Sequence, residues 1–121
     1  MARRVVLAMV ALAGVACGPG AAEKERWAAM AAAGREAYEA ESCGACHGAT
    51  LGGSRTGPPL QGLASEFTED ELVSLLRDPA RWVRDDARVA RLAKRFPGRM
   101  SGLPAADEQR LRSLAAYLLS R

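Results

Sequence analysis

Large aromatic side chains and histidine are scarce in this chain. Its 121 residues include only two Phe, two Tyr and two Trp, and the single His is His47. A domain of this size buries a limited share of its surface, and few bulky side chains are present to fill an interior. The composition favours one small domain whose core is completed by a bound cofactor.

Long hydrophobic runs and a strong excess of charge are also missing. No stretch reaches the roughly 20 consecutive apolar residues that a membrane-spanning helix needs. The formal net charge is +3, and removal of residues 1–16, with Arg3 and Arg4, leaves 15 basic against 14 acidic side chains. Such a balance predicts no nucleic-acid partner.

The N-terminal segment has the order of an export signal. Arg3 and Arg4 precede an apolar run over residues 5–13, and small residues follow. This order predicts a signal peptide over residues 1–16, with a buried first helix as the alternative. Export places the mature chain in an oxidising compartment, on the periplasmic side of the membrane.

Cys17 follows small residues that resemble the cleavage box of bacterial lipoproteins, although Gly14 stands where leucine is usual. The resemblance implies an acylated Cys17, a short linker over residues 17–22 and a domain over residues 23–121 anchored to the membrane by lipid. Ordinary cleavage after Ala13 or Ala16 is the alternative. It would give a soluble periplasmic or secreted protein with a spare thiol.

Apolar residues at helical spacing predict four helices in the mature chain. The stripes are Trp27, Met30, Ala31, Gly34 and Tyr38; Leu72, Val73, Leu75 and Leu76; Val89, Leu92, Ala93 and Phe96; and Leu111, Leu114, Ala115 and Leu118. Thr68 with Glu71 has the pattern of a capping box, and Asp85 or Asp86 is suited to cap the third helix. No segment alternates as a strand does, so the predicted fold is all-α.

The residues Cys43-Gly44-Ala45-Cys46-His47 fit the C-x-x-C-H pattern of covalent c-type haem attachment. The spacing sets the two sulfurs about one helical turn apart, and the adjacent histidine can present a ring nitrogen to iron. We therefore predict one covalent haem c, with Cys43, Cys46 and His47 as its attachment and iron-ligand residues.

Three other interpretations of the two cysteines remain. A thioredoxin-like pair expects a strand before the motif and a βαβ context, whereas a helical pattern precedes it here. A structural zinc site needs four ligands, and outside the motif the chain offers only Cys17 and no second His. A disulfide between Cys43 and Cys46 is the third.

The sixth iron ligand is predicted to be a methionine sulfur, because His47 is the only histidine. Met30 and Met100 are the candidates in the mature chain. Met30 shares an apolar face with Trp27 and Tyr38, whereas Met100 follows Pro97 and Gly98 in a predicted loop. This placement favours Met100.

From Gly34 to Tyr117 the chain resembles class I, monohaem cytochrome c, in its bacterial lipoprotein type. The resemblance implies N- and C-terminal helices that cross beside the haem, with Gly34 and Tyr38 on the first and Leu114 and Tyr117 on the second. Thr56 to Leu60 resembles the loop in which a proline carbonyl, here that of Pro58, accepts a hydrogen bond from the proximal imidazole.

The same resemblance implies that the Trp82 indole binds a haem propionate and that Met100 ligates iron, although Ser101 replaces the proline that commonly follows this ligand. The implied function is electron transfer, without catalysis, between redox proteins near the membrane, as a monomer or as a subunit of a respiratory complex. A subunit of a thiosulfate-oxidising or dehydrogenase complex and a five-coordinate haem sensor are the alternatives. Arg84, Arg88, Arg91 and Arg95 recur at helical spacing, as a solvated face or a basic face for an acidic partner.

Overall fold

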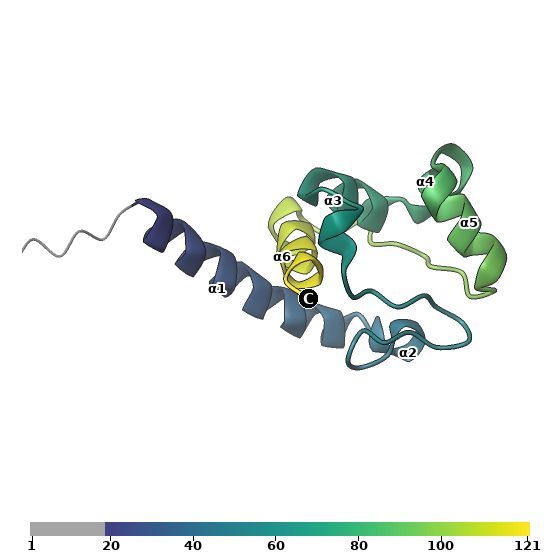
Figure 1. Ribbon diagram of the computed structural model, residues 1–121, viewed down its shortest axis with the longest axis horizontal. Helices are drawn as coiled ribbons and strands as arrows, with labels where there is room; N and C mark the ends of the chain where they lie inside the picture. The colour runs from purple at the N-terminus through teal and green to yellow at the C-terminus, as the bar shows by residue number, and fades with distance from the viewer. Residues whose placement is uncertain (1–18) are drawn as a thin grey trace, which may run out of the picture.

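The computed structural model describes residues 19–121, which form helices joined by loops (Figure 1). The elements are α1 (Pro19–Ala40), α2 (Gly44–His47), the short 3-10 helix η1 (Leu63–Ser65), α3 (Glu69–Arg77), α4 (Pro79–Asp85), α5 (Ala87–Arg95) and α6 (Glu108–Leu119). This part of the chain contains no strand, which confirms the all-α prediction. No helix within it is both long and apolar enough to cross a membrane. The predicted signal peptide and Cys17 lie outside the described residues.

Helix α1 begins at Pro19, so the segment predicted as a linker over residues 17–22 is helical in its last four residues. Proline suits the first turn of a helix because its missing N–H has no partner there and its φ is already helical. Residues 20–26 are exposed, and this end of α1 extends away from the other helices (Figure 1). The domain therefore carries a projecting helical arm at its N-terminal end.

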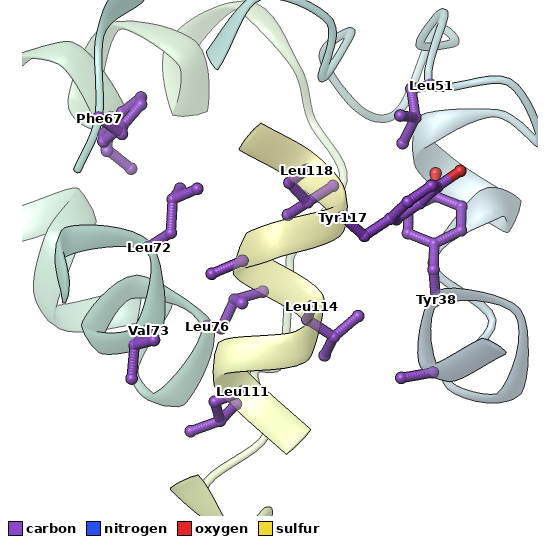
Figure 2. Close-up of a cluster of buried hydrophobic side chains, with 13 residues drawn as sticks. Tyr38, Leu51, Phe67, Leu72, Val73, Leu76, Leu111, Leu114, Tyr117 and Leu118 are labelled. Carbon is purple, nitrogen blue, oxygen red and sulfur yellow. The ribbon is translucent and has the colours of Figure 1, made fainter. Parts of the chain in front are cut away.

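The crossing of α1 and α6 forms the centre of the fold. Tyr38 on α1 meets Tyr117 on α6 edge to face, with ring centroids 5.6 Å apart. Figure 2 shows α6 between these aromatic rings and the apolar side chains of α3. Leu111 and Leu114 on α6 are fully buried, at 0% and 1% exposure. The helix crossing that the family resemblance implied is present.

The helix caps predicted at Thr68 and Asp86 are both present in the structure. Thr68 and Glu71 form a reciprocal capping box at the start of α3, and the Asp86 carboxylate accepts from the backbone N–H groups at the start of α5. Helix α4 is not among the four helices predicted from the apolar stripes. In the structure Asp78 caps α4 and Pro79 occupies its first turn.

Candidate haem-attachment site

The C-x-x-C-H motif lies on the turn that follows α1. Ser42 adopts a left-handed φ of 57°, and the Cys43 N–H donates to the Tyr38 carbonyl at 3.1 Å. Four residues of helix then end at Gly48, whose φ of 83° suits glycine. The motif is thus held against the end of a long helix by backbone hydrogen bonds.

The two cysteines are not joined in a disulfide, and they differ in exposure. The Cys43 side chain is half-buried and that of Cys46 is exposed. Burial and the neighbouring Glu41 carboxylate raise the pKa of the Cys43 thiol. Both sulfurs are therefore available for covalent attachment, with Cys43 held as a neutral thiol until it reacts.

His47 has a defined proton arrangement. Its Nδ1 atom lies 2.9 Å from the carbonyl oxygen of Pro58. A carbonyl only accepts, so Nδ1 carries the proton and donates, and the lone pair of the neutral ring is on Nε2. The atom left free to ligate a haem iron is therefore Nε2, and the contact with Pro58 fixes the orientation of the ring.

The loop that carries Pro58 is braced against the motif itself. The Gly53 N–H donates to the His47 carbonyl at 2.8 Å, and the Ser54 hydroxyl donates to the Cys46 carbonyl at 2.6 Å. A Cβ atom at Gly57 would lie 2.8 Å from the same Cys46 oxygen. Because the backbone passes this close, only glycine fits there without moving the neighbouring Pro58 carbonyl.

Met100 lies in the loop between α5 and α6, which is tied down on both sides. Before it, the Gly98 N–H donates to the Thr56 carbonyl at 3.1 Å, and after it the Leu103 N–H donates to the Leu76 carbonyl at 2.8 Å. The side chain of Met100 is 40% exposed. The first tie brings the Met100 loop to the same segment that carries Pro58.

Met30 lies far from the motif along α1. It is partly buried and precedes the end of the helix at Ala40 by ten residues, which is about 15 Å at 1.5 Å per residue. The structure therefore separates Met30 from His47, while backbone hydrogen bonds connect the Met100 loop to the His47 loop. This arrangement favours Met100 as the second ligand.

Trp82 is on α4, where its ring lies near that of Phe67 with centroids 6.4 Å apart. Its indole N–H donates to the Ser74 hydroxyl at 3.0 Å. A haem propionate at Trp82 would therefore share or replace this acceptor. The role of Trp82 toward a propionate stays a prediction.

The residues present fit a covalently bound haem. Two free thiols one helical turn apart, beside a histidine whose Nε2 carries the lone pair, supply the chemistry of c-type attachment. A structural zinc ion has no comparable site, since residues 19–121 contain no group of three or more Cys, His, Asp and Glu side chains suited to hold a metal. The thioredoxin-like context is also missing from this part, because α1 precedes the motif.

The all-helical fold and this site define a haem c protein. The cytochrome c family model matches residues 31–121, about three quarters of the chain, and the chain belongs to that family. Members of the family bind covalent haem c with iron, and their role is electron transfer. Neither the curated proteins nor the solved structures gave a significant match.

Some contributors to the site were not predicted from the sequence. Ser54 donates to the motif backbone, Ser74 accepts from Trp82, and the Thr56 to Gly98 hydrogen bond ties two loops. Pro97 and Gly98 indicated a turn, but nothing in the local sequence indicated its partner 42 residues earlier. These contacts depend on tertiary neighbours.

Proposed function

We propose that this protein is a monohaem electron carrier whose iron is ligated by His47 and Met100. The single observation that carries the proposal is the 2.9 Å contact between His47 Nδ1 and the Pro58 carbonyl. It directs Nε2 to iron and holds the ring in one orientation, and a carrier benefits because fixed ligands limit reorganisation during electron transfer. When bound, the haem supplies the one-electron couple.

The chain's own residues have separate roles in this proposal. Cys43 and Cys46 hold the haem through thioether bonds, and Pro58 orients His47. The hydrogen bond from Gly98 holds the Met100 loop near the segment that carries Pro58, and the one from Leu103 fastens the loop to α3. Two protein ligands leave no open coordination position, so the proposed protein transfers electrons and is not an enzyme.

The first test is the absorption spectrum of protein expressed with c-type maturation, oxidised and reduced, with and without carbon monoxide. We expect a low-spin c-type spectrum, a weak methionine-to-ferric-iron band and no gas binding. Met100→Leu should lose that band and bind carbon monoxide, whereas the matched control Met30→Leu should behave as the parent. Gas binding by the parent, or loss of the band in the Met30 variant, contradicts the ligand assignment.

A five-coordinate haem sensor is the second candidate function. The 40% exposure of the Met100 side chain and the presence of Ser101, in place of proline, favour it. Ready carbon monoxide binding by the unmodified protein would support the sensor. A subunit of a larger oxidoreductase complex is distinguished from a free carrier by copurification of a catalytic partner.

We further propose that Cys17 is acylated and anchors the protein on the periplasmic side of the membrane. The small residues before Cys17 support this assignment. The protein should fractionate with membranes and incorporate labelled fatty acid, and Cys17→Ser should release it into the soluble periplasmic fraction. Unlabelled, soluble parent protein would instead indicate ordinary cleavage after Ala13 or Ala16.

A further inference from the structure

The loop that carries Met100 is held in place by few contacts. No side chain over residues 97–106 is fully buried, and within this range only Leu103 and Ala106 pack against the core. Both lie after Met100 in the chain. Before Met100, the loop is fastened by the hydrogen bond from the Gly98 N–H to the Thr56 carbonyl, at 3.1 Å. The position of Met100 therefore depends on the position of Thr56.

Thr56 is itself exposed, and the hydroxyl of Ser54 holds it. The Ser54 Oγ atom lies 3.1 Å from the Thr56 backbone nitrogen and 3.0 Å from the Thr56 Oγ1 atom. The same Oγ atom lies 2.6 Å from the carbonyl oxygen of Cys46. Ser54 therefore lies between the haem-attachment motif and the residue to which the Met100 loop is fastened.

The direction of these hydrogen bonds follows from the single proton of the Ser54 hydroxyl. A carbonyl only accepts, so Ser54 donates its proton to Cys46. Ser54 must then accept from both the N–H and the hydroxyl of Thr56. The bonds thus run in one direction, from Thr56 through Ser54 to Cys46, and hydrogen bonds aligned in this way strengthen one another.

The orientation of His47 does not need the Ser54 side chain. The Gly53 N–H donates to the His47 carbonyl at 2.8 Å, and the Ser54 N–H donates to the Gly57 carbonyl at 2.9 Å. The contact of His47 Nδ1 with Pro58 likewise uses a backbone carbonyl. Alanine at residue 54 keeps all of these groups. The hydroxyl of Ser54 therefore serves Thr56 and the methionine side of the site.

We infer that Ser54 is a positioning residue for Met100. Its hydroxyl fixes Thr56 against the haem motif, and Thr56 in turn holds the Met100 loop in place for ligation of iron. The inference rests on the proposed ligation by Met100 and adds a residue that controls it. Because the Met100 side chain is 40% exposed, the bond to iron depends on where the loop lies and not on burial of the side chain.

The test is Ser54→Ala in the ferric holoprotein, with imidazole as a competing ligand. Imidazole binds the iron only when Met100 has left it, so the apparent association constant reports the fraction of protein with an open loop. Loss of the hydroxyl should raise that constant about threefold or more and weaken the methionine-to-iron band. Ser54→Thr keeps the hydroxyl and should restore the values of the parent.

Ser65→Ala is the matched control. Ser65 is also exposed, and its hydroxyl also donates to a backbone carbonyl, that of Gly62 at 2.9 Å, but it lies on η1. This variant should bind imidazole as the parent does. An equal rise in both variants would overturn the inference, because a general loss of stability would then explain it. An unchanged constant in Ser54→Ala would overturn it as well.

A double-mutant cycle tests whether Ser54 acts through the Met100 loop. Ser54→Ala and Gly98→Ala both release the contact between Thr56 and Gly98, so their effects on the logarithm of the imidazole constant should sum to less than the total of the two. Full additivity would show that Ser54 acts elsewhere. Thr56→Val removes one of the two donors to Ser54 and should give a smaller rise, which keeps the inference testable if Ser54→Ala retains little haem.

The imidazole-bound form separates the two sides of the iron. In that form His47 is the remaining protein ligand, so its reduction potential should be the same in the parent and in Ser54→Ala. A shifted potential there would overturn the inference, because the serine would then act on His47.

Failure of the proposed function has a different signature. A parent holoprotein that lacks the methionine-to-iron band and binds carbon monoxide readily overturns both the ligation by Met100 and the role of Ser54. A parent that has the band, and whose imidazole constant is insensitive to Ser54→Ala, overturns the role of Ser54 alone.

Discussion

Gly34 lies directly against the backbone of Ser113 where α1 crosses α6. A Cβ atom on residue 34 would be 1.8 Å from the Ser113 carbonyl oxygen and 2.8 Å from the Tyr117 Cβ. Because the obstacle includes backbone, it cannot move aside as the end of a flexible side chain can. The distance between the two helices is therefore set by the absence of a side chain at this one position.

Gly34→Ala should separate the two helices and lower the free energy of unfolding by about 2–4 kcal/mol, a cost typical of overpacking or more. Gly20→Ala is the matched control, because its added methyl group meets nothing within 4 Å. That variant should be neutral or up to about 1 kcal/mol more stable, since alanine favours helix. Urea unfolding of the ferric holoprotein measures both, and equal stabilities would contradict the close crossing.

Loss of the Tyr38 hydroxyl proton should lower the free energy of unfolding in the alkaline range. Burial, with the nearby Cys43 and Tyr117, raises the pKa of Tyr38 to about 12, and its hydroxyl donates to the Gly48 carbonyl at 2.7 Å. The folded chain therefore holds this proton more tightly than the unfolded chain, whose tyrosine has a pKa near 10. The contribution is complete below about pH 10 and is lost as the pH rises toward 12.

Tyr38→Phe tests that assignment. The substitution should lower the free energy of unfolding at pH 7 by about 1 kcal/mol, because the hydrogen bond to Gly48 is lost. It should also remove part of the decline in that free energy between about pH 10 and 12. Unfolding curves measured across this range for parent and variant give the result. An unchanged alkaline slope would show that another group is responsible.

Arg88 should govern stability in acid. The pKa of Asp86 is lowered to about 2, chiefly by hydrogen bonds from the Arg88 side chain. The pKa of Glu71 is lowered by the Thr68 backbone N–H and by Arg88. Both groups stabilise the fold when ionised, so their contribution is present above their ordinary pKa values and is lost as the pH falls through the lowered ones.

Arg88→Met should therefore lower stability at neutral pH and move the midpoint of acid unfolding to higher pH. Arg35→Met is the control, because Arg35 pairs with Glu39 on the exposed surface of α1 alone, at 3.3 Å. Its acid midpoint should match that of the parent. A circular dichroism titration distinguishes the two, and coincident curves would remove Arg88 from this role.

Gly57 should control the environment of His47 more strongly than Pro58 does. Pro58→Ala keeps the backbone carbonyl of residue 58, which accepts from His47 Nδ1. Gly57→Ala introduces a Cβ atom 2.8 Å from the Cys46 carbonyl oxygen, and the backbone shift that follows displaces the carbonyl of residue 58. Loss of the hydrogen bond makes the imidazole a weaker electron donor, so the reduction potential of the Gly57 variant should rise. Potentiometric titration measures it, and a larger shift for Pro58→Ala would refute the role of the backbone.

Gly98→Ala should loosen the Met100 loop. The added Cβ would come too close to the Thr56 carbonyl oxygen and break the tie to the Gly98 N–H. We expect partial loss of the methionine-to-iron band and measurable carbon monoxide binding. Ser101→Ala, in the same loop and exposed, is the control and should retain the parent spectrum.

Local signals in the sequence determined a large part of this protein. The motif from Cys43 to His47, the capping box at Thr68 and the cap at Asp86 each act within a few residues, and the structure contains both caps. The helical stripes likewise report most of the buried faces, although Ala93 of the stripe on α5 is exposed. Such features depend on neighbours three or four residues away, so periodicity and spacing are enough to predict them.

Tertiary structure alone decided how these pieces meet. Pro79 both ends one helix pattern and starts α4, and only the Asp78 cap in the folded chain shows the second role. Helical spacing placed Arg88 with its basic neighbours, but its guanidinium pairs with Glu71 on α3 and with Asp86, the cap of its own helix. The Thr56 to Gly98 hydrogen bond that joins the Met100 loop to the His47 loop spans 42 residues. Contacts of this length arise from packing between segments, which the local pattern of a sequence does not encode.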